Sequence, residues 1–290
     1  MLHPQTESEA YAIEQNERFF QAVRSVPSYI RWLYGARMNM RSEDLLEVNE
    51  LLPDLDVVFH SRMAEVERKP RPGIIRPIVE SITRFVRQAP KGKRFRIASL
   101  GCGSMEAERQ GIEAVNRNGT AQKMTVVGFD TSARTRQFAQ KNLSSLADVR
   151  VVREERLTKS RLIELEQETS ENVLVIISGN DIFTLASDFT PGTFDLVMTA
   201  LFLHHLDKER RTRLVEHMSV LAPHTLNYDG YKNEMVIPLL SITGWGSPVF
   251  LNAAVFSSIR FMGREGVSRL HAGAKIDFYN HGHYRAVSSS

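Results

Sequence analysis

A short apolar run that stops at two closely spaced glycines constrains the fold of this chain more than any other feature. Residues 97–100 are apolar or small, and Gly101-Cys102-Gly103 and a helix-favouring segment, 105–117, come directly after them. Glycine permits positive φ and lets the backbone approach a ligand that a Cβ atom would exclude. The pattern therefore predicts a buried strand, a tight turn and a helix.

A second apolar run, residues 124–129, ends at Asp130 and Thr131. A glycine turn after one strand and an acid after the next are how α/β sheets hold a nucleoside. The glycines make room for the ligand, and the acid accepts hydrogen bonds from the ribose hydroxyls. The two runs together predict a nucleoside site at the carboxyl ends of these strands.

Short strands alternate with helices from about residue 95, which is typical of a doubly wound parallel sheet. We expect strands at 95–100, 124–129, 173–178, 194–199 and 225–229, and helices at 105–117, 133–146 and 208–221. Residues 149–152 are a possible further strand. Residues 275–287 turn at Gly282 and predict an antiparallel hairpin. We expect residues 1–90 to form a helical cap or substrate lid, and residues 91–290 the ligand-binding domain.

Two more strands end in polar groups at the same expected edge. The strand at 173–178 leads into Asp181 and Ile182, a carboxylate beside an apolar residue that could bind a base. The run beginning at Phe194 continues past its strand to His204 and His205. Since ligands of open α/β sheets bind beyond the carboxyl ends of the strands, these groups should converge on one crevice.

These four motifs, in this order, resemble the class I S-adenosylmethionine-dependent methyltransferases over about residues 95–287. The closest likeness is to the small-molecule type, which has a His-His-Leu segment after the fourth strand. The resemblance implies a Rossmann-like, doubly wound, seven-stranded sheet with a terminal antiparallel hairpin and an N-terminal helical cap. It also implies S-adenosylmethionine as cofactor.

The resemblance also assigns roles to residues. Gly101 and Gly103 would approach the amino-acid half of the cofactor, Asp130 would bind the ribose, and Leu201 would lie near the methyl group. Asp181 and Ile182 would hold the adenine. The full expected cofactor set is Ser99, Gly101, Cys102, Gly103, Asp130, Thr131, Asp181, Ile182 and Leu201.

His204 is the expected general base of this family pattern, with His205 as the second candidate. A histidine with its ordinary pKa, about 6.5, is suited to take a proton from a phenol or enol at neutral pH. Two residues depart from the family pattern: Ser99 stands where an acid is common, and Met105 stands where a third glycine is usual. Both departures affect expected contacts to the methionine portion of the cofactor.

Composition narrows the class of protein. The single cysteine, Cys102, excludes an internal disulfide and fits a reducing, cytoplasmic compartment. The N-terminus shows no basic segment followed by an apolar core, so we expect no signal peptide. The uncharged run 235–259 is broken by prolines and glycines, which favours a buried or pocket-lining segment over a membrane span. No metal-ligand spacing is present, so we expect no metal.

The expected reaction is methylation of a small, hydrophobic or aromatic acceptor, with oxygen favoured over nitrogen or carbon. The aromatic acceptor is suggested by Trp245, Phe250 and Phe256. One alternative is an RNA or protein methyltransferase, because residues 61–96 hold eleven Lys and Arg against three Glu. We favour a solvated helix face for this stretch and expect no nucleic-acid partner. A non-catalytic cofactor-binding scaffold is the other alternative, and a homodimer is plausible.

Overall fold

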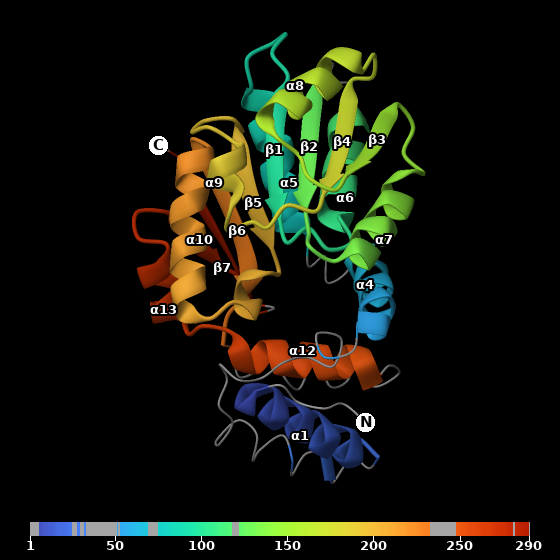
Figure 1. Cartoon of the computed structure of the whole chain (residues 1–290). Coiled ribbons are helices and arrows are strands. Elements are labelled where there is room, and N and C mark those ends of the chain that lie inside the picture. The colour runs from blue at the N-terminus through green and yellow to red at the C-terminus, as the bar shows by residue number, and fades with distance from the viewer. Residues whose placement is uncertain are drawn as a thin grey trace.

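The computed structural model describes residues 6–24, 28–29, 32, 51, 53–68, 75–117, 122–232, 248–280 and 282–289. In these ranges, eight strands form one sheet in the order β3-β4-β2-β1-β5-β6-β8-β7 (Figure 1). The strands are β1 Phe95–Leu100, β2 Met124–Phe129, β3 Val149–Glu154, β4 Val173–Ser178, β5 Leu196–Ala200, β6 His224–Gly230, β7 Lys275–Phe278 and β8 His283–Ser289.

The helices surround this sheet. They are α1 Glu7–Ala22, α4 Pro53–Arg68, α5 Arg76–Gln88, α6 Glu106–Arg117, α7 Ala133–Leu143, α8 Lys159–Glu168, α9 Leu185–Asp188, α10 Lys208–Leu221, α12 Pro248–Arg260 and α13 Arg264–Leu270. A short 3₁₀ turn, η2 Leu203–His205, follows β5. The predicted helix at 133–146 ends earlier, at Leu143, and the strand expected at 194–199 begins later, at Leu196.

The predicted α/β sheet with a terminal antiparallel hairpin is confirmed. β1 pairs in parallel with β2 and with β5, so the chain reverses its direction of winding at β1. β8 runs antiparallel to both β6 and β7. The expectation of seven strands was wrong, because residues 149–154 pair with β4 along their whole length and add an eighth, edge strand.

The apolar runs form strands because the central part of the sheet is covered on both faces. Every residue of β2 and of β4 is buried. On one face the core joins the sheet to α5, α6 and α7 through Ile82, Ile112 and Leu143. On the other face it joins the sheet to α8, α9 and α10, through Leu165 and Met218 among others. This double cover fixes the sheet and leaves its carboxyl edge as the place where polar loops meet.

α12 lies beyond the carboxyl edge of the sheet, with α1 against its other side (Figure 1). It contacts η2 directly after β5, and it also contacts α4. Residues 248–259 of the uncharged stretch form most of α12, whereas residues 233–247 lie outside the described part. α1 packs onto α12 through an aromatic cluster that includes Phe19, Trp32 and Phe256.

Over the described ranges, none of the helices combines the length and the apolar character needed to cross a bilayer.

Candidate functional site

The turn after β1 requires glycine. Gly101 and Gly103 have φ angles of +63° and +51°, in the left-handed region that residues with a Cβ rarely adopt. A Cβ atom on Gly101 would lie 2.2 Å from the ring of Phe202, which follows β5. The first and fourth sequence motifs are therefore in contact across the sheet edge.

The glycine turn is also joined to Asp130. The Gly103 backbone N–H donates to Oδ2 of Asp130 over 3.2 Å, and the Ser132 N–H donates to Oδ1 over 2.9 Å. Ser132 is in turn the N-cap of α7, which fixes the loop that carries Asp130. This geometry gives the donor and acceptor set that a nucleoside cofactor needs: a turn with two left-handed glycines beside an anionic acceptor. The residues present thus fit S-adenosylmethionine.

Although Met105 replaces the usual third glycine, its backbone conformation is the one that a glycine would favour. Met105 has a φ of +54°, so its backbone takes the conformation that a third glycine would favour. Its side chain is buried and packs against Gly128, where a Cβ would lie 2.6 Å from Sδ of Met105 and 2.8 Å from Sγ of Cys102. Burial, with Asp130 and Glu108 nearby, raises the pKa of the Cys102 thiol well above its ordinary value. Cys102 is therefore a packed thiol rather than a thiolate nucleophile.

The departure at Ser99 is accompanied by a carboxyl group from another element. The buried hydroxyl of Ser99 donates to Oε1 of Glu108, in the first turn of α6. Both side chains are fully enclosed. An acid thus lies next to position 99, although it comes from the helix and not from the strand.

The expected adenine residues lie at the end of β4, beside Asp130. The Asp130 N–H donates to the Ser178 carbonyl over 3.0 Å, which brings the two loops together. Ile182 is buried, and Asp181 is exposed, with its Oδ1 accepting the Phe183 N–H. Thr131 is exposed, and its carbonyl accepts from the guanidinium of Arg136. The structure gathers these loops at one edge; their roles toward a cofactor stay predictions.

His204 forms a buried dyad with Asp229, at the end of β6. Its Nδ1 lies 2.7 Å from Oδ1 of Asp229, and its backbone N–H donates to Oδ2 over 2.8 Å. The Gly230 N–H also donates to Oδ1 of Asp229. These donors hold the carboxylate in place and orient the imidazole, so that Nδ1 carries the proton and Nε2 is the basic nitrogen.

Burial sets the charge state of this dyad. It lowers the pKa of His204 to about 4, although Asp229 opposes the shift, so the imidazole is neutral at pH 7. Burial would raise the pKa of Asp229, but His204 and the two backbone N–H groups outweigh it and hold that pKa below its ordinary value. The site therefore contains a neutral histidine against a fixed anion.

His205 and Leu201 complete the segment after β5. The two histidine rings lie 4.1 Å apart, and Arg260 from α12 donates to the His205 carbonyl over 2.6 Å. Leu201 has a φ of +53° and donates its N–H to the Tyr228 carbonyl. A left-handed leucine is strained by about 1 kcal/mol or more, and such strain is concentrated at functional sites. η2 ends before Asp207, the N-cap of α10.

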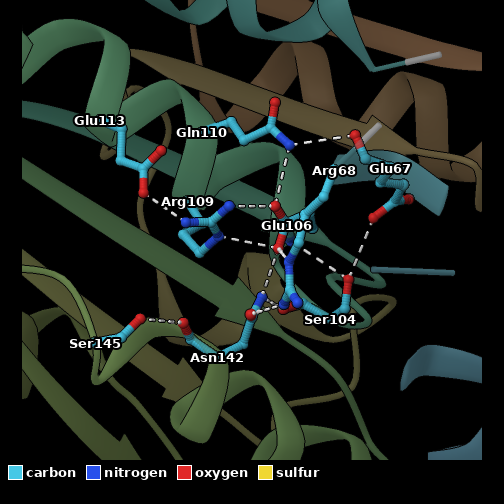
Figure 2. Close-up of polar contacts among 9 residues, drawn as sticks. All are labelled: Glu67, Arg68, Ser104, Glu106, Arg109, Gln110, Glu113, Asn142 and Ser145. Carbon is cyan, nitrogen blue, oxygen red and sulfur yellow. Dashed lines mark hydrogen bonds and ion pairs between the residues drawn. The ribbon is translucent and has the colours of Figure 1, made fainter. Parts of the chain in front are cut away.

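A second polar cluster lies on the other side of the glycine turn, between α4 and α6 (Figure 2). Ser104, one residue after Gly103, donates to Oε2 of Glu67 over 3.4 Å. Glu106 accepts from Arg68 and Arg109. α4, from the expected cap, is therefore bonded to the glycine turn itself.

The sequence analysis missed Asp229 and Glu67. Asp229 had a usable signal, because it lies at the carboxyl end of a predicted strand, where the other site residues lie. For Glu67 the sequence contains no such signal, because a glutamate on an amphipathic helix is usually solvated. In the described ranges, no group of three His, Cys, Asp or Glu side chains is placed to hold a metal ion.

Comparison with known proteins gives fold neighbours only. No family model matches the sequence, and no curated protein matches it. The DszA carbon methyltransferase matches at 15% identity and a TM-score of 0.51, over 96% of this chain and 66% of that one. The CurJ carbon methyltransferase matches at 11% identity and a TM-score of 0.50, over 99% and 71%.

Human N-acetylserotonin methyltransferase, in complex with S-adenosylmethionine, matches at 13% identity and a TM-score of 0.50, over 94% of this chain and 70% of that one. The chain thus spans about two thirds to 71% of the length of these three structures. At such low identity the likeness concerns the backbone architecture alone. On these grounds the protein has the fold of the class I S-adenosylmethionine-dependent methyltransferases.

Proposed function

We propose that this protein is an S-adenosylmethionine-dependent methyltransferase that acts on a small acceptor, with an oxygen atom favoured. The observation that carries the proposal is the hydrogen bond from the Gly103 N–H to Asp130 at the carboxyl edge of the sheet. It joins a turn with two glycines to an anionic acceptor, as a nucleoside cofactor requires. The methyltransferase neighbours support the same reading, and one of them is described in complex with this cofactor.

The backbone of Gly101 and Gly103 would contact the amino-acid half of the cofactor, and Asp130 would accept hydrogen bonds from the ribose hydroxyls. Asp181 and Ile182 would bind the adenine end. When bound, S-adenosylmethionine supplies a methyl group already activated by a sulfonium sulfur. The protein then has to position the acceptor and exclude water.

His204 would accept the proton of the acceptor. Its imidazole is neutral at pH 7, so the basic nitrogen is in the required state, and Asp229 stabilises the positive charge as the proton arrives. His205, with its ring beside that of His204, is the second candidate.

The cap region, residues 1–90 together with α12, would enclose the acceptor. α12 lies against η2, which carries His204, so a substrate held beneath α12 would be near the dyad. Of the three aromatic residues expected to form an apolar wall, Phe256 is buried against Phe19 and Trp32. Trp245 and the side chain of Phe250 lie outside the described part. An apolar acceptor remains our proposal on the strength of the uncharged stretch.

The test is an acceptor screen that measures S-adenosylhomocysteine release by mass spectrometry. Phenols, other small oxygen nucleophiles and carbon acids would be compared. With a working acceptor, His204→Ala should lower kcat about a hundredfold or more while cofactor affinity changes little. His224→Ala is the matched control, because His224 begins β6 at the opposite end of the strand. Equal rates in both variants would remove His204 from the proposal.

The basic stretch 61–96 motivates the second candidate, an RNA or protein methyltransferase. Several of its eleven cations are used within the fold: Arg96 pairs with Glu166, Arg68 with Glu106 and Arg76 with Glu80. This use favours the small-molecule reading. A salt-sensitive gel shift with RNA would reverse that preference. Binding of cofactor without turnover on any acceptor would favour the scaffold alternative.

The cytoplasmic location and the homodimer belong to the proposal as well. The first rests on a single thiol, which is buried. Sedimentation analysis tests the second.

A further inference from the structure

Three carboxyl groups gather beside the glycine turn, and only one of them is matched by cations. Glu106, at the start of α6, accepts from Arg68 over 3.1 Å and from Arg109 over 2.6 Å (Figure 2). Gln110 and Asn142 also donate to it, over 3.0 Å and 3.1 Å. These donors hold the pKa of Glu106 below its ordinary value, although burial opposes them. Glu106 is thus a fully paired structural anion.

The carboxyl group of Glu67 lies in the same cluster, but it is not paired with arginines as Glu106 is. Its carboxyl points to Ser104, while the neighbouring Arg68 turns its guanidinium toward Glu106 and Asn142 (Figure 2). No Lys or Arg whose side chain the structure describes forms an ion pair with Glu67. Burial, followed by the charges of Glu106 and Glu108, raises its pKa to about 8, against opposition from Ser104 and Arg68.

Glu108 shows the same imbalance. It is fully buried, its carboxyl group accepts a hydrogen bond from the hydroxyl of Ser99, and burial raises its pKa. Tyr228, on β6, also lies within electrostatic range of Glu67. The groups that face Glu67 from α4, α6, the glycine turn and β6 are therefore Arg68, Glu106, Glu108, Ser104 and Tyr228. Among the side chains that the structure describes around the turn, Glu106 is paired with Arg68 and Arg109, and Glu67 and Glu108 have no ion pair.

S-adenosylmethionine carries a cation at the matching place. Its methionine portion ends in an α-ammonium group, and the backbone of Gly101–Gly103 is where that portion would approach. A buried carboxylate that lacks a cation is stabilised when one arrives at hydrogen-bond distance. Ser104 directly follows this turn, and its hydroxyl donates to the carboxyl group of Glu67.

We propose that Glu67 binds the α-ammonium group of the cofactor, so that the last turn of α4 forms part of the cofactor site. This inference rests on the proposed function and assigns to a cap helix a contact that position 99 of the strand cannot make. The sequence departure at Ser99 is thereby compensated from α4, with Glu108 behind it.

Two consequences follow. Cofactor binding releases about one proton at neutral pH, because Glu67 changes from carboxylic acid to carboxylate as the ammonium arrives. Cofactor binding also ties α4 to the glycine turn, which couples the cap to the loaded site.

The test is calorimetry with S-adenosylhomocysteine and with methylthioadenosine, which lacks the amino-acid portion. Titrations in two buffers of different ionisation enthalpy give the number of protons released. For the wild type at pH 6.5, we expect about one proton released with S-adenosylhomocysteine and none with methylthioadenosine. In Glu67→Gln, the affinity for S-adenosylhomocysteine should fall about ten- to hundredfold, and the proton release should disappear. The affinity for methylthioadenosine should stay within about twofold of the wild type.

Glu65→Gln is the matched control, because Glu65 is an exposed glutamate on the same helix. It should leave both affinities unchanged. The wild-type proton count needs no variant, so it tests the proposal even if Glu67→Gln folds poorly. The proposal is overturned if Glu67→Gln weakens both ligands equally, if it weakens neither, or if no proton is released. If neither ligand binds the wild type, the proposed function itself fails, and that result is distinct from the others.

Discussion

Two buried polar sites flank the glycine turn, and they differ in how their charge is balanced. On the β5–β6 side, His204 and Asp229 form a complete pair, with two backbone N–H groups completing the carboxylate. On the α4–α6 side, Glu106 is paired, whereas no Lys or Arg side chain in the described part of the chain forms an ion pair with Glu67 or Glu108. In the first site, protein groups alone balance the charge of the carboxylate. Under our proposal, the ammonium group of the cofactor completes the second.

Buried charges are tolerated only with partners, and this rule explains the difference. The pKa of Asp229 is held low by His204 and two backbone N–H donors, whereas burial and the charges of Glu106 and Glu108 raise the pKa of Glu67. A site whose charges are balanced without a ligand suits a catalytic group with a fixed tautomer. A site that is balanced only with ligand suits a binding group.

The largest expected effect separates the two kinds of carboxyl group. Glu106→Gln leaves Arg68 and Arg109 without their shared anion and should lower the free energy of unfolding by about 3 kcal/mol, because breaking a buried pair exposes an unmatched charge. Glu67→Gln should instead raise the free energy of unfolding at pH 7, because Gln resembles the protonated acid and removes the cost of protonating the carboxyl group on folding. Urea unfolding measures both. Equal losses would contradict the contrast between them.

The second prediction concerns the complete pair. Asp229→Asn should lower kcat about a hundredfold, because the amide can donate to Nδ1 of His204 and favour the wrong tautomer. Cofactor affinity should stay within about threefold, since Asp229 lies on the other side of the turn. The wild-type rate should be level from pH 6 to 8 and fall only as His204 is protonated near pH 4. An unchanged kcat in the variant would remove Asp229 as a positioning residue.

The third prediction tests the turn that separates the sites. Gly101→Ala should lower the free energy of unfolding by about 2 kcal/mol, since the new Cβ meets Phe202 in a left-handed backbone. Gly92→Ala is the matched control, because Gly92 has a φ of +82° with nothing within 4 Å of the added Cβ. It should cost about 1 kcal/mol, from the backbone alone. Thermal melts of the two variants compare them, and an equal loss would mean that Phe202 does not limit the turn.

The smallest effect is a difference in pH dependence. The folded pKa of Glu67 is raised from 4.5 to about 8, so its contribution to stability is full below pH 4.5 and is lost as pH rises toward 8. His204 acts oppositely, but only between about pH 4 and 6.5. From pH 6.5 to 8, the wild type should therefore lose stability relative to Glu67→Gln. If the stability of both proteins changes with pH in parallel between pH 6.5 and 8, Glu67 does not titrate with a raised pKa.

The sequence was sufficient for the architecture and for one half of the site. β2 and β4 are buried on both faces, so each appears as an unbroken apolar segment whose end marks the sheet edge. Asp130 and Gly103 could be placed together for that reason. The edge strand β3 was harder, because its residues are only partly buried and its charged positions resemble a loop.

Contacts made by separate helices could not be predicted in this way. Glu67 and Ser104 are 37 positions apart, and nothing in the local pattern of α4 marks one glutamate as partly buried against the turn. The partnership of Ser99 with Glu108 depends on how α6 packs on β1. Met105 was expected to weaken contacts to the methionine portion of the cofactor; its left-handed backbone and the packing of its side chain beside Gly128 could not be read from the sequence.

The central claim is that the glycine turn and Asp130 bind S-adenosylmethionine. Isothermal calorimetry of the cofactor and of S-adenosylhomocysteine, with the wild type and with Asp130→Ala, tests it most directly. We predict micromolar binding of both ligands to the wild type and a loss of about a hundredfold or more in the variant, because two ribose hydroxyls lose a charged acceptor. Absence of binding to the folded wild type, or equal binding to both proteins, would contradict the account.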